Sequence, residues 1–164
     1  MTPDFAATHD HSYCVAQALD DAEALCEQQG KRLTPLRKRV LELVWLDHKP
    51  VNAYDILRVL AQEGWGSSPP VAYRALAFLT NLGVVHRLER LNAFVGCVNA
   101  KNPHLAEFFI CTDCGEVTET VNADVANGLR RAANDIGFSV SHSVVEIEGR
   151  CRNCQPKLAA EMHP

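Results

Sequence analysis

The residues best suited to chemistry in this chain are its cysteines, four of which form two C-x-x-C pairs. The pairs are Cys111 with Cys114, and Cys151 with Cys154. A C-x-x-C turn places two thiolates on one metal ion, and two such turns complete a tetrahedral sulfur site that suits zinc. Because four sulfurs leave no coordination position open, we expect a structural zinc. A thioredoxin-type redox couple is the alternative, but a single C-x-x-C would suffice for it.

A second group of potential ligands contains His86, Cys97, His104 and Glu119. Each of these residues, taken alone, is more often a packed or a solvent-exposed residue than a metal ligand. Together they lie on or beside the expected junction between the two halves of the chain. A site of nitrogen, sulfur and oxygen donors at that place would link the orientation of one domain to metal occupancy.

The first half of the chain must position part of this second group, and its sequence predicts helices. Helices are expected over 12–29, from Thr34-Pro35 to before Pro50, from Asn52 to Gly64, and from Ser68-Pro69-Pro70 to Gly83. Thr, Asn and Ser are favoured N-cap residues, and proline is tolerated in the first turn. The apolar spacing predicts that the third helix buries Tyr54, Ile56, Leu57 and Leu60, and the fourth Ala75, Leu76, Leu79 and Leu82.

The fourth helix then presents Tyr73 and Arg74 outward, near its start. Two short strands, 84–91 and 94–98, follow it around Asn92-Ala93. Two helices joined by a tight turn and followed by a hairpin make a winged helix-turn-helix, a DNA-binding arrangement.

The second half has a different pattern: strands over 105–110 and 117–121, a helix over 123–136 and a strand over 138–147. We therefore predict an α+β protein. Its expected parts are a flexible tail (1–11), a winged-helix DNA-binding domain (12–98), a hinge (99–104) and a small C-terminal α/β domain with the four-cysteine zinc site (105–164).

Composition narrows the function classes. The chain has 164 residues and a formal net charge of -4. Residues 31–95 nevertheless carry ten bases against five acids, whereas residues 1–30 carry six acids and no base. A basic module inside an acidic protein can bind nucleic acid, because phosphate responds to the local potential. No apolar run approaches the ~20 residues of a membrane helix, and no signal peptide is visible, so we expect a cytoplasmic protein.

Several segments, in order along the chain, resemble the ferric uptake regulator family, and within it the zinc uptake regulator branch. The matching segments are 32–37 (RLTPLR), 53–57 (AYDIL), 69–79 (PPVAYRALAFL), 83–86 (GVVH) and 109–115 (FICTDCG). The resemblance implies a homodimeric, zinc-sensing transcriptional repressor that binds palindromic operator DNA, with two Zn2+ per protomer and no catalytic residue. It also implies that the C-terminal domain is the dimerisation domain.

The resemblance places the structural zinc on Cys111, Cys114, Cys151 and Cys154, and the regulatory zinc on His86, Cys97, His104 and Glu119. Tyr73, Arg74, Arg32, Arg37 and Lys31 are the candidate DNA contacts, with Arg74 the candidate for a base edge. The chain departs from the family where Val71-Ala72 replaces the usual Thr-Val, and no ligand role is assigned to His9, His11 or Cys14.

Three alternatives remain open at the level of sequence. An iron- or manganese-sensing member of the same family would share the fold, although the soft Cys97 thiolate and the single histidine before the first C-x-x-C favour zinc. A zinc-storage or thiol-redox protein would bind metal without metal-dependent DNA affinity. A zinc hydrolase or deaminase is disfavoured because no H-x-E motif precedes Cys111, which removes the general acid and base.

Overall fold

The computed structural model describes residues 11–46, 49–102, 104–140 and 143–155. The chain divides into two compact units, one reaching to His104 and the other beginning at Leu105. The expected tail, 1–11, lies outside the described residues except for His11, and so does Pro103 of the expected hinge. No helix within the described ranges is both long and apolar enough to cross a membrane.

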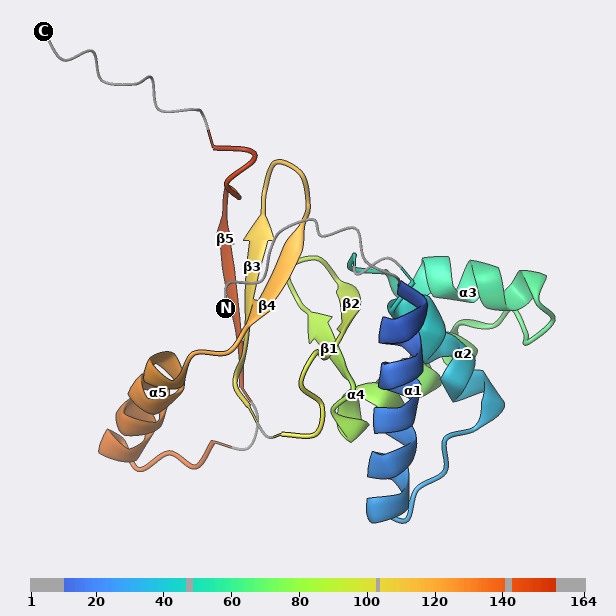
Figure 1. The fold of residues 1–164 in the computed structure, drawn as a ribbon, viewed down its shortest axis with the longest axis horizontal. Coiled ribbons are helices and arrows are strands. Elements are labelled where there is room, and N and C mark those ends of the chain that lie inside the picture. Colours follow the sequence, from blue (N-terminus) through green and yellow to red (C-terminus); the bar gives the residue numbers. More distant parts are fainter. Residues whose placement is uncertain (1–10, 47–48, 103, 141–142, 156–164) are drawn as a thin grey trace, which may run out of the picture. The chain divides into compact units, whose positions relative to one another are not determined.

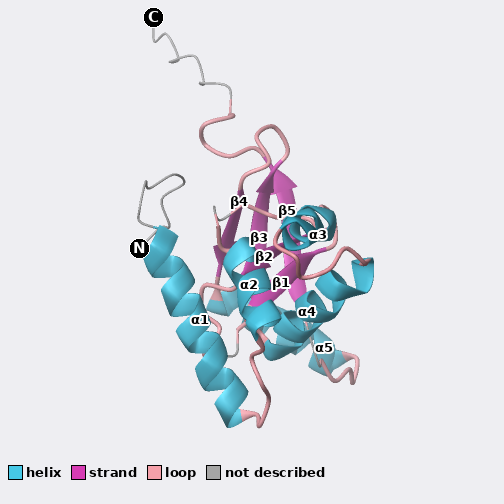
Figure 2. Cartoon of the chain, turned by 90° about the vertical axis from the view of Figure 1, so that its right-hand side faces the viewer, coloured by secondary structure: helices cyan, strands magenta, loops and turns pink. Residues whose placement is uncertain are grey.

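The first unit holds four helices and a two-stranded hairpin in its described part. The elements are α1 (His11–Gln28), α2 (Pro35–Val44), α3 (Ala53–Gln62), α4 (Pro69–Leu82), β1 (Val85–Leu88) and β2 (Ala93–Gly96). Figure 2 shows α2, α3 and α4 gathered together, with α1 along one side of them. Helix, helix, turn, helix and hairpin in this order form the winged helix-turn-helix predicted from the sequence.

Two of the three predicted N-caps make their hydrogen bonds, and the third does not. The Thr34 hydroxyl accepts from the Arg37 amide at 3.4 Å, and the Asn52 side chain accepts from the Asp55 amide at 2.9 Å. Ser68 makes no side-chain cap bond. Pro69 and Pro70 remove the amides of the first two helical positions. The Val71 amide is the equivalent of the Arg37 and Asp55 amides in the other two caps, but it donates to the Ser68 carbonyl at 3.0 Å instead of the side chain.

The core of the first unit follows the predicted helix faces, with one error. In α4 the predicted residues are buried, all at 4% exposure or less, and Tyr73 and Arg74 are exposed. In α3, however, Tyr54 is 67% exposed, whereas Ala53, Ile56 and Leu60 are buried. The prediction for Tyr54 was wrong because Ala53, Ile56 and Leu60 recur at helical spacing, and Tyr54 lies about 100° from their face.

The wing is shorter than the sequence predicted, and it is tied to the helices. β1 and β2 are antiparallel, with His86 opposite Val95, and the turn between them places Asn92 at φ 46. Asparagine tolerates this left-handed conformation better than most residues. Val51 and Phe94 exchange two backbone hydrogen bonds, of 2.9 and 2.8 Å. This bridge joins β2 to the segment between α2 and α3. The hairpin is therefore held by hydrogen bonds to that segment as well as by its chain connection to α4.

The second unit consists, as far as it is described, of a three-stranded sheet and a helix. Its elements are β3 (Ala106–Cys111), β4 (Val117–Thr120), α5 (Ala123–Asp135) and β5 (Val144–Gly149). The sheet order is β4-β3-β5, with β4 antiparallel and β5 parallel to the central strand. Figure 1 shows these strands in yellow to red. The strand predicted over 138–147 was misplaced: Phe138 to Val140 have no strand structure, and 141–142 lie outside the described residues.

Helix α5 buries little of its own apolar surface in this unit. Ala133 is its only buried residue, while Val125, Leu129 and the following Ile136 are 38%, 44% and 78% exposed. Phe138 is 63% exposed, and Phe109 on β3 is 43% exposed. An amphipathic helix normally buries its apolar stripe against another element. The second unit therefore has apolar surface that its described residues leave exposed.

Candidate metal centres and reading helix

The two C-x-x-C pairs meet in the second unit. The Sγ atoms of Cys111, Cys114, Cys151 and Cys154 all lie within 4.8 Å of one another, and the structure contains no disulfide among them. The Cys114 and Cys151 sulfurs are 3.8 Å apart. Thiolate sulfurs bound to one zinc at ~2.3 Å are tetrahedral neighbours at about this separation. The arrangement therefore fits a closed, structural zinc site.

The parallel pairing of β3 with β5 explains how two pairs separated by 36 residues come together. In the register of these strands Cys111 lies opposite Gly149, two residues before Cys151. The Thr112 amide donates to the Gly149 carbonyl at 2.8 Å, which extends the pairing past the strand end. Each C-x-x-C then turns back on itself: the Gly115 amide donates to the Cys111 carbonyl, and the Cys154 amide to the Cys151 carbonyl, both at 2.9 Å.

The electrostatics of the cluster favour a bound cation. Hydrogen bonds from the backbone amides of Cys151, Cys114 and Asp113 lower the pKa of the Cys111 thiol to about 6. The pKa of the Cys154 thiol is raised, because its hydrogen bonds with the Cys151 and Cys114 sulfurs favour the protonated form. One thiolate is thus stabilised by the turn, whereas four cannot coexist without positive charge. A divalent ion would supply that charge, because a coordinated thiol is deprotonated.

A second group of soft ligands lies within the first unit. The ligand atoms of His86, Cys97 and His104 lie within 4.8 Å of one another. The Cys97 sulfur is 3.6 Å from His104 Nε2, and the His86 and His104 rings meet edge to face at 5.7 Å between centroids. Cys97 is buried, and both histidines are half-buried. Two imidazoles and one thiolate form a donor set that suits zinc or copper better than oxygen-preferring ions.

The His104 ring is oriented by the backbone. Its Nδ1 lies 2.8 Å from the Asn102 carbonyl oxygen. A carbonyl can only accept, so Nδ1 carries the hydrogen of this contact, and Nε2 is the nitrogen that faces the Cys97 sulfur. Metal-bound histidines are commonly held in this way by a hydrogen bond from the other ring nitrogen. The sequence does not reveal this contact, because any residue at 102 would offer the same carbonyl.

Glu119, the fourth predicted regulatory ligand, belongs to the second unit. It lies half-buried on β4, opposite Phe108 of β3. The other three residues lie on β1, directly after β2 and at the end of the first unit. The structure therefore brings three of the four predicted ligands together within one unit, and the participation of Glu119 stays a prediction.

A glycine beside Cys97 determines how the wing packs. A Cβ added at Gly96 would overlap the indole ring of Trp45, which is buried after the end of α2. We predict that Gly96→Ala lowers the free energy of unfolding by about 1–3 kcal/mol through overpacking, measured by urea denaturation of the zinc-loaded protein. The smaller ring of Trp45→Phe should restore part of the loss in the double variant. Equal stability of Gly96→Ala and wild type would refute the close packing.

The candidate DNA contacts surround the starts of α2 and α4. Lys31, Arg32, Tyr73 and Arg74 are exposed, the Tyr73 side chain by 42%. A hollow of about 320 Å³ opens between the two helix starts, lined by Thr34, Arg37, Ser68, Val71 and Arg74 among others. Exposed bases around two helix N-termini produce a positive potential, which suits phosphate.

Arg37 already has intramolecular partners. Its guanidinium carbon lies 3.4 Å from the centroid of the Phe78 ring, and its Nη1 donates to the Arg32 carbonyl at 2.6 Å. The contact joins α2 to α4. A guanidinium has five donors, so a phosphate contact remains open to it. Its stacking on Phe78 was not predicted, because the two residues lie far apart in the sequence.

The family model described as "Ferric uptake regulator family" matches residues 28–148. The chain belongs to this family. It is 38% identical to the zinc uptake regulation protein of Escherichia coli K12 over 149 residues, which cover 90% of this chain and 86% of that protein. It is 26% identical to the peroxide-responsive repressor PerR of Staphylococcus aureus over 146 residues, or 87% of this chain and 95% of PerR.

Two solved structures are similar over most of the chain. A zinc uptake regulator complexed with zinc and DNA has a TM-score of 0.78 and 36% identity, covering 90% of this chain and 96% of that one. The crystal structure of holo XcZur has a TM-score of 0.76 and 36% identity, covering 85% of this chain and 97% of that one. The family and the α+β fold predicted from the sequence are thereby confirmed.

Proposed function

We infer that this chain is a zinc-responsive transcriptional repressor of zinc uptake genes, which binds palindromic operator DNA as a zinc-loaded dimer. One observation carries the inference: a winged helix-turn-helix unit contains a cluster of His86, Cys97 and His104, in a chain 38% identical to a zinc uptake regulation protein. We propose that it acts in the cytoplasm, without catalytic activity.

Each protomer is proposed to bind two zinc ions with different roles. The four cysteines of the second unit hold one ion in a closed site, which supplies folding energy and no open position for substrate. His86, Cys97, His104 and Glu119 hold the other. Because Glu119 belongs to the second unit, its binding to an ion held by the first unit would fix the orientation of the two units. Occupancy of this site would then be sensed as a change in geometry.

The exposed apolar surface of the second unit supports a dimer. Val125, Leu129, Ile136, Phe138 and Phe109 are all more than a third exposed. Contiguous apolar surface marks a protein interface, and we propose that these side chains contribute to one. A second copy of the chain would cover it in a two-fold arrangement, which also suits a palindromic operator, because protein symmetry then matches DNA symmetry.

The proposed mechanism is a population shift. Zinc favours the arrangement in which two winged domains match two half-sites, whereas the zinc-free dimer samples arrangements that do not match. A shift from 1:99 to 99:1 needs about 5.5 kcal/mol of differential zinc affinity, which two sensing sites per dimer can share. By linkage, operator DNA must tighten zinc binding by the same factor.

The DNA contacts give a prediction that separates base reading from phosphate binding. Arg74 on the exposed face of α4 is proposed to contact a base edge, preferably guanine, and Lys31 to contact phosphate. Arg74→Ala should lose about 1–3 kcal/mol of operator affinity and blur the sequence preference, while Lys31→Ala should weaken binding to all sequences alike. The affinities of both variants for the operator and for point-mutated duplexes measure the loss of affinity and the change in sequence preference. A uniform effect of both variants would refute the base-reading role of Arg74.

One titration tests the function as a whole. The full-length protein, loaded at the four-cysteine site, is titrated with buffered zinc in the presence of a palindromic duplex, and binding is followed by gel shift. Zinc-dependent binding is expected. Metal binding without any DNA affinity would indicate a zinc-storage or thiol-redox protein, and a stronger response to Fe2+ or Mn2+ than to zinc would indicate another sensing branch.

A further inference from the structure

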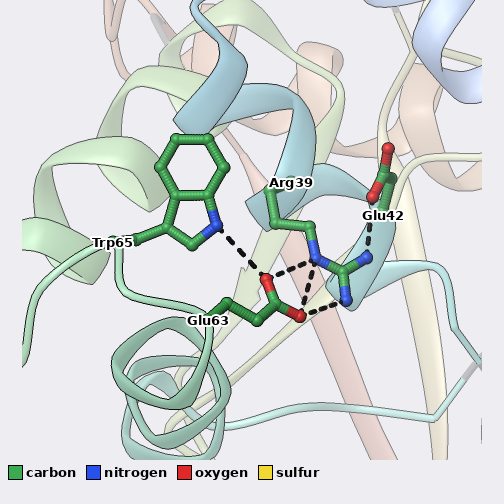
Figure 3. Close-up of polar contacts among 4 residues, drawn as sticks. All are labelled: Arg39, Glu42, Glu63 and Trp65. Carbon is green, nitrogen blue, oxygen red and sulfur yellow. Dashed lines mark hydrogen bonds and ion pairs between the residues drawn. The ribbon is translucent and has the colours of Figure 1, made fainter.

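An arginine on α2 joins that helix to the turn that precedes α4, the helix that carries Tyr73 and Arg74. Arg39 Nε donates to the two Glu63 carboxylate oxygens at 2.9 and 3.2 Å, and Nη2 donates to one of them at 2.7 Å. The Trp65 indole N–H donates to the same carboxylate at 3.2 Å. Figure 3 shows the carboxylate between the guanidinium and the indole. We name Arg39, Glu63 and Trp65 the turn clasp.

The turn clasp lies where the backbone itself offers little rigidity. Glu63 is the residue after α3, and α4 begins at Pro69. Between them Gly64 and Gly66 take φ values of 81° and 119°, which are left-handed conformations that glycine adopts readily. The unfolded chain has most freedom at such residues, so a side-chain tie across them restricts the turn most effectively.

The geometry of the pair is that of a specific contact. The guanidinium binds the carboxylate through two nitrogens, and the two side chains are only 33% and 32% exposed. Hydrogen bonding to Arg39 lowers the pKa of Glu63, so the carboxylate is ionised at neutral pH. A bidentate arginine–carboxylate pair fixes direction as well as distance. This pair joins α2 to the residue after α3, whereas the Arg39–Glu42 pair, at 2.7 Å, lies within α2 alone.

We propose that the turn clasp positions the start of α4 on DNA, so that Arg39 and Glu63 are positioning residues for operator recognition. The proposal rests on the proposed DNA-binding function. Arg39 contributes by aligning the turn that leads into Pro69 and the exposed face of Tyr73 and Arg74. Its two carboxylate partners offset its charge, so it needs no phosphate contact for this role.

Matched variants test the proposal in the full-length, zinc-loaded protein. Glu63→Gln and Glu42→Gln each neutralise one of the two carboxylates that bind Arg39. Only Glu63→Gln removes the charge that ties Arg39 to the turn between α3 and α4. Arg39→Gln is matched by Arg58→Gln, because Arg58 pairs with Asp55 inside α3 at 2.5 Å. The probe is a palindromic duplex selected with the wild-type protein from a random pool, together with a scrambled duplex.

We expect Glu63→Gln and Arg39→Gln to lose about three- to tenfold of the ratio of operator to scrambled-duplex affinity, and the double variant to lose no more than either. Glu42→Gln and Arg58→Gln should keep the wild-type ratio. Trp65 fluorescence should change in Glu63→Gln but not in Glu42→Gln. A ratio compares two duplexes on the same folded protein, so a purely structural loss would leave it unchanged.

The outcomes separate this proposal from the proposed function. If wild type selects no duplex with zinc, the proposed DNA-binding function fails, and the turn clasp fails with it. If wild type selects a duplex while Glu63→Gln and Glu42→Gln discriminate equally well, only the positioning role of the turn clasp is overturned.

Discussion

Replacing Cys151 by serine is expected to unfold the second unit and to release one zinc per protomer. Cys151 is buried in the four-sulfur cluster, next to the end of β5. A structural zinc contributes about 10–16 kcal/mol of folding free energy in small peptides, which is comparable with the whole stability of a domain, ~5–15 kcal/mol. Serine offers a hard, protonated oxygen in place of a thiolate. Circular dichroism and metal analysis of the purified protein measure the effect.

Cys14→Ser is the matched control for this substitution. Cys14 lies half-buried on α1 and belongs to neither group of ligands. It should keep its zinc content and its spectrum. A Cys151→Ser protein that keeps both its strand content and its full zinc content would show that the four-cysteine cluster does not hold a structural ion.

Replacing Cys97 by serine is expected to abolish zinc-dependent DNA binding while the protein stays folded. Cys97 supplies the only sulfur of the second group, at 3.6 Å from His104 Nε2. Its loss removes the soft donor that favours zinc, so the zinc-induced gain in operator affinity should fall by about 100-fold or more. Operator binding at fixed free zinc, together with zinc stoichiometry, measures the effect.

His104→Ala should give the same result, since it removes the adjacent nitrogen donor. In both variants the zinc content should fall from two ions to one, and the four-cysteine ion should remain. The scheme would be contradicted if Cys97→Ser bound operator with an unchanged zinc response. A Glu119→Gln variant that also kept its response would limit the regulatory site to ligands of the first unit.

The helical parts of the fold were predictable because their signals are local. Thr34 and Asn52 cap their helices as expected, and the apolar stripe of α4 is buried. Two errors concerned residues whose local signal was ambiguous. Ser68 makes no side-chain cap bond, because the Val71 amide donates to the Ser68 carbonyl, and Tyr54 is exposed because Ala53, Ile56 and Leu60 form the buried face of α3.

The candidate sites were predictable as sets of residue types, but the contacts that orient them were not. The hydrogen bond from His104 to the Asn102 carbonyl depends on the path of the backbone. The overlap that a side chain at Gly96 would cause depends on where Trp45 packs. The Arg39–Glu63 pair joins residues that are 24 positions apart. None of these contacts has a periodic or spaced signal in the sequence.

The sequence by itself determined the types of the candidate ligands, the starts of most helices and the family, because thiol and imidazole spacing, caps and apolar periodicity act over a few residues. Only the tertiary structure decided which of these groups meet. Parallel pairing of β3 with β5 brings the two cysteine pairs to one point, and the wing brings His86 and Cys97 to His104. Such meetings depend on packing between segments distant in the chain, and no local pattern encodes that packing.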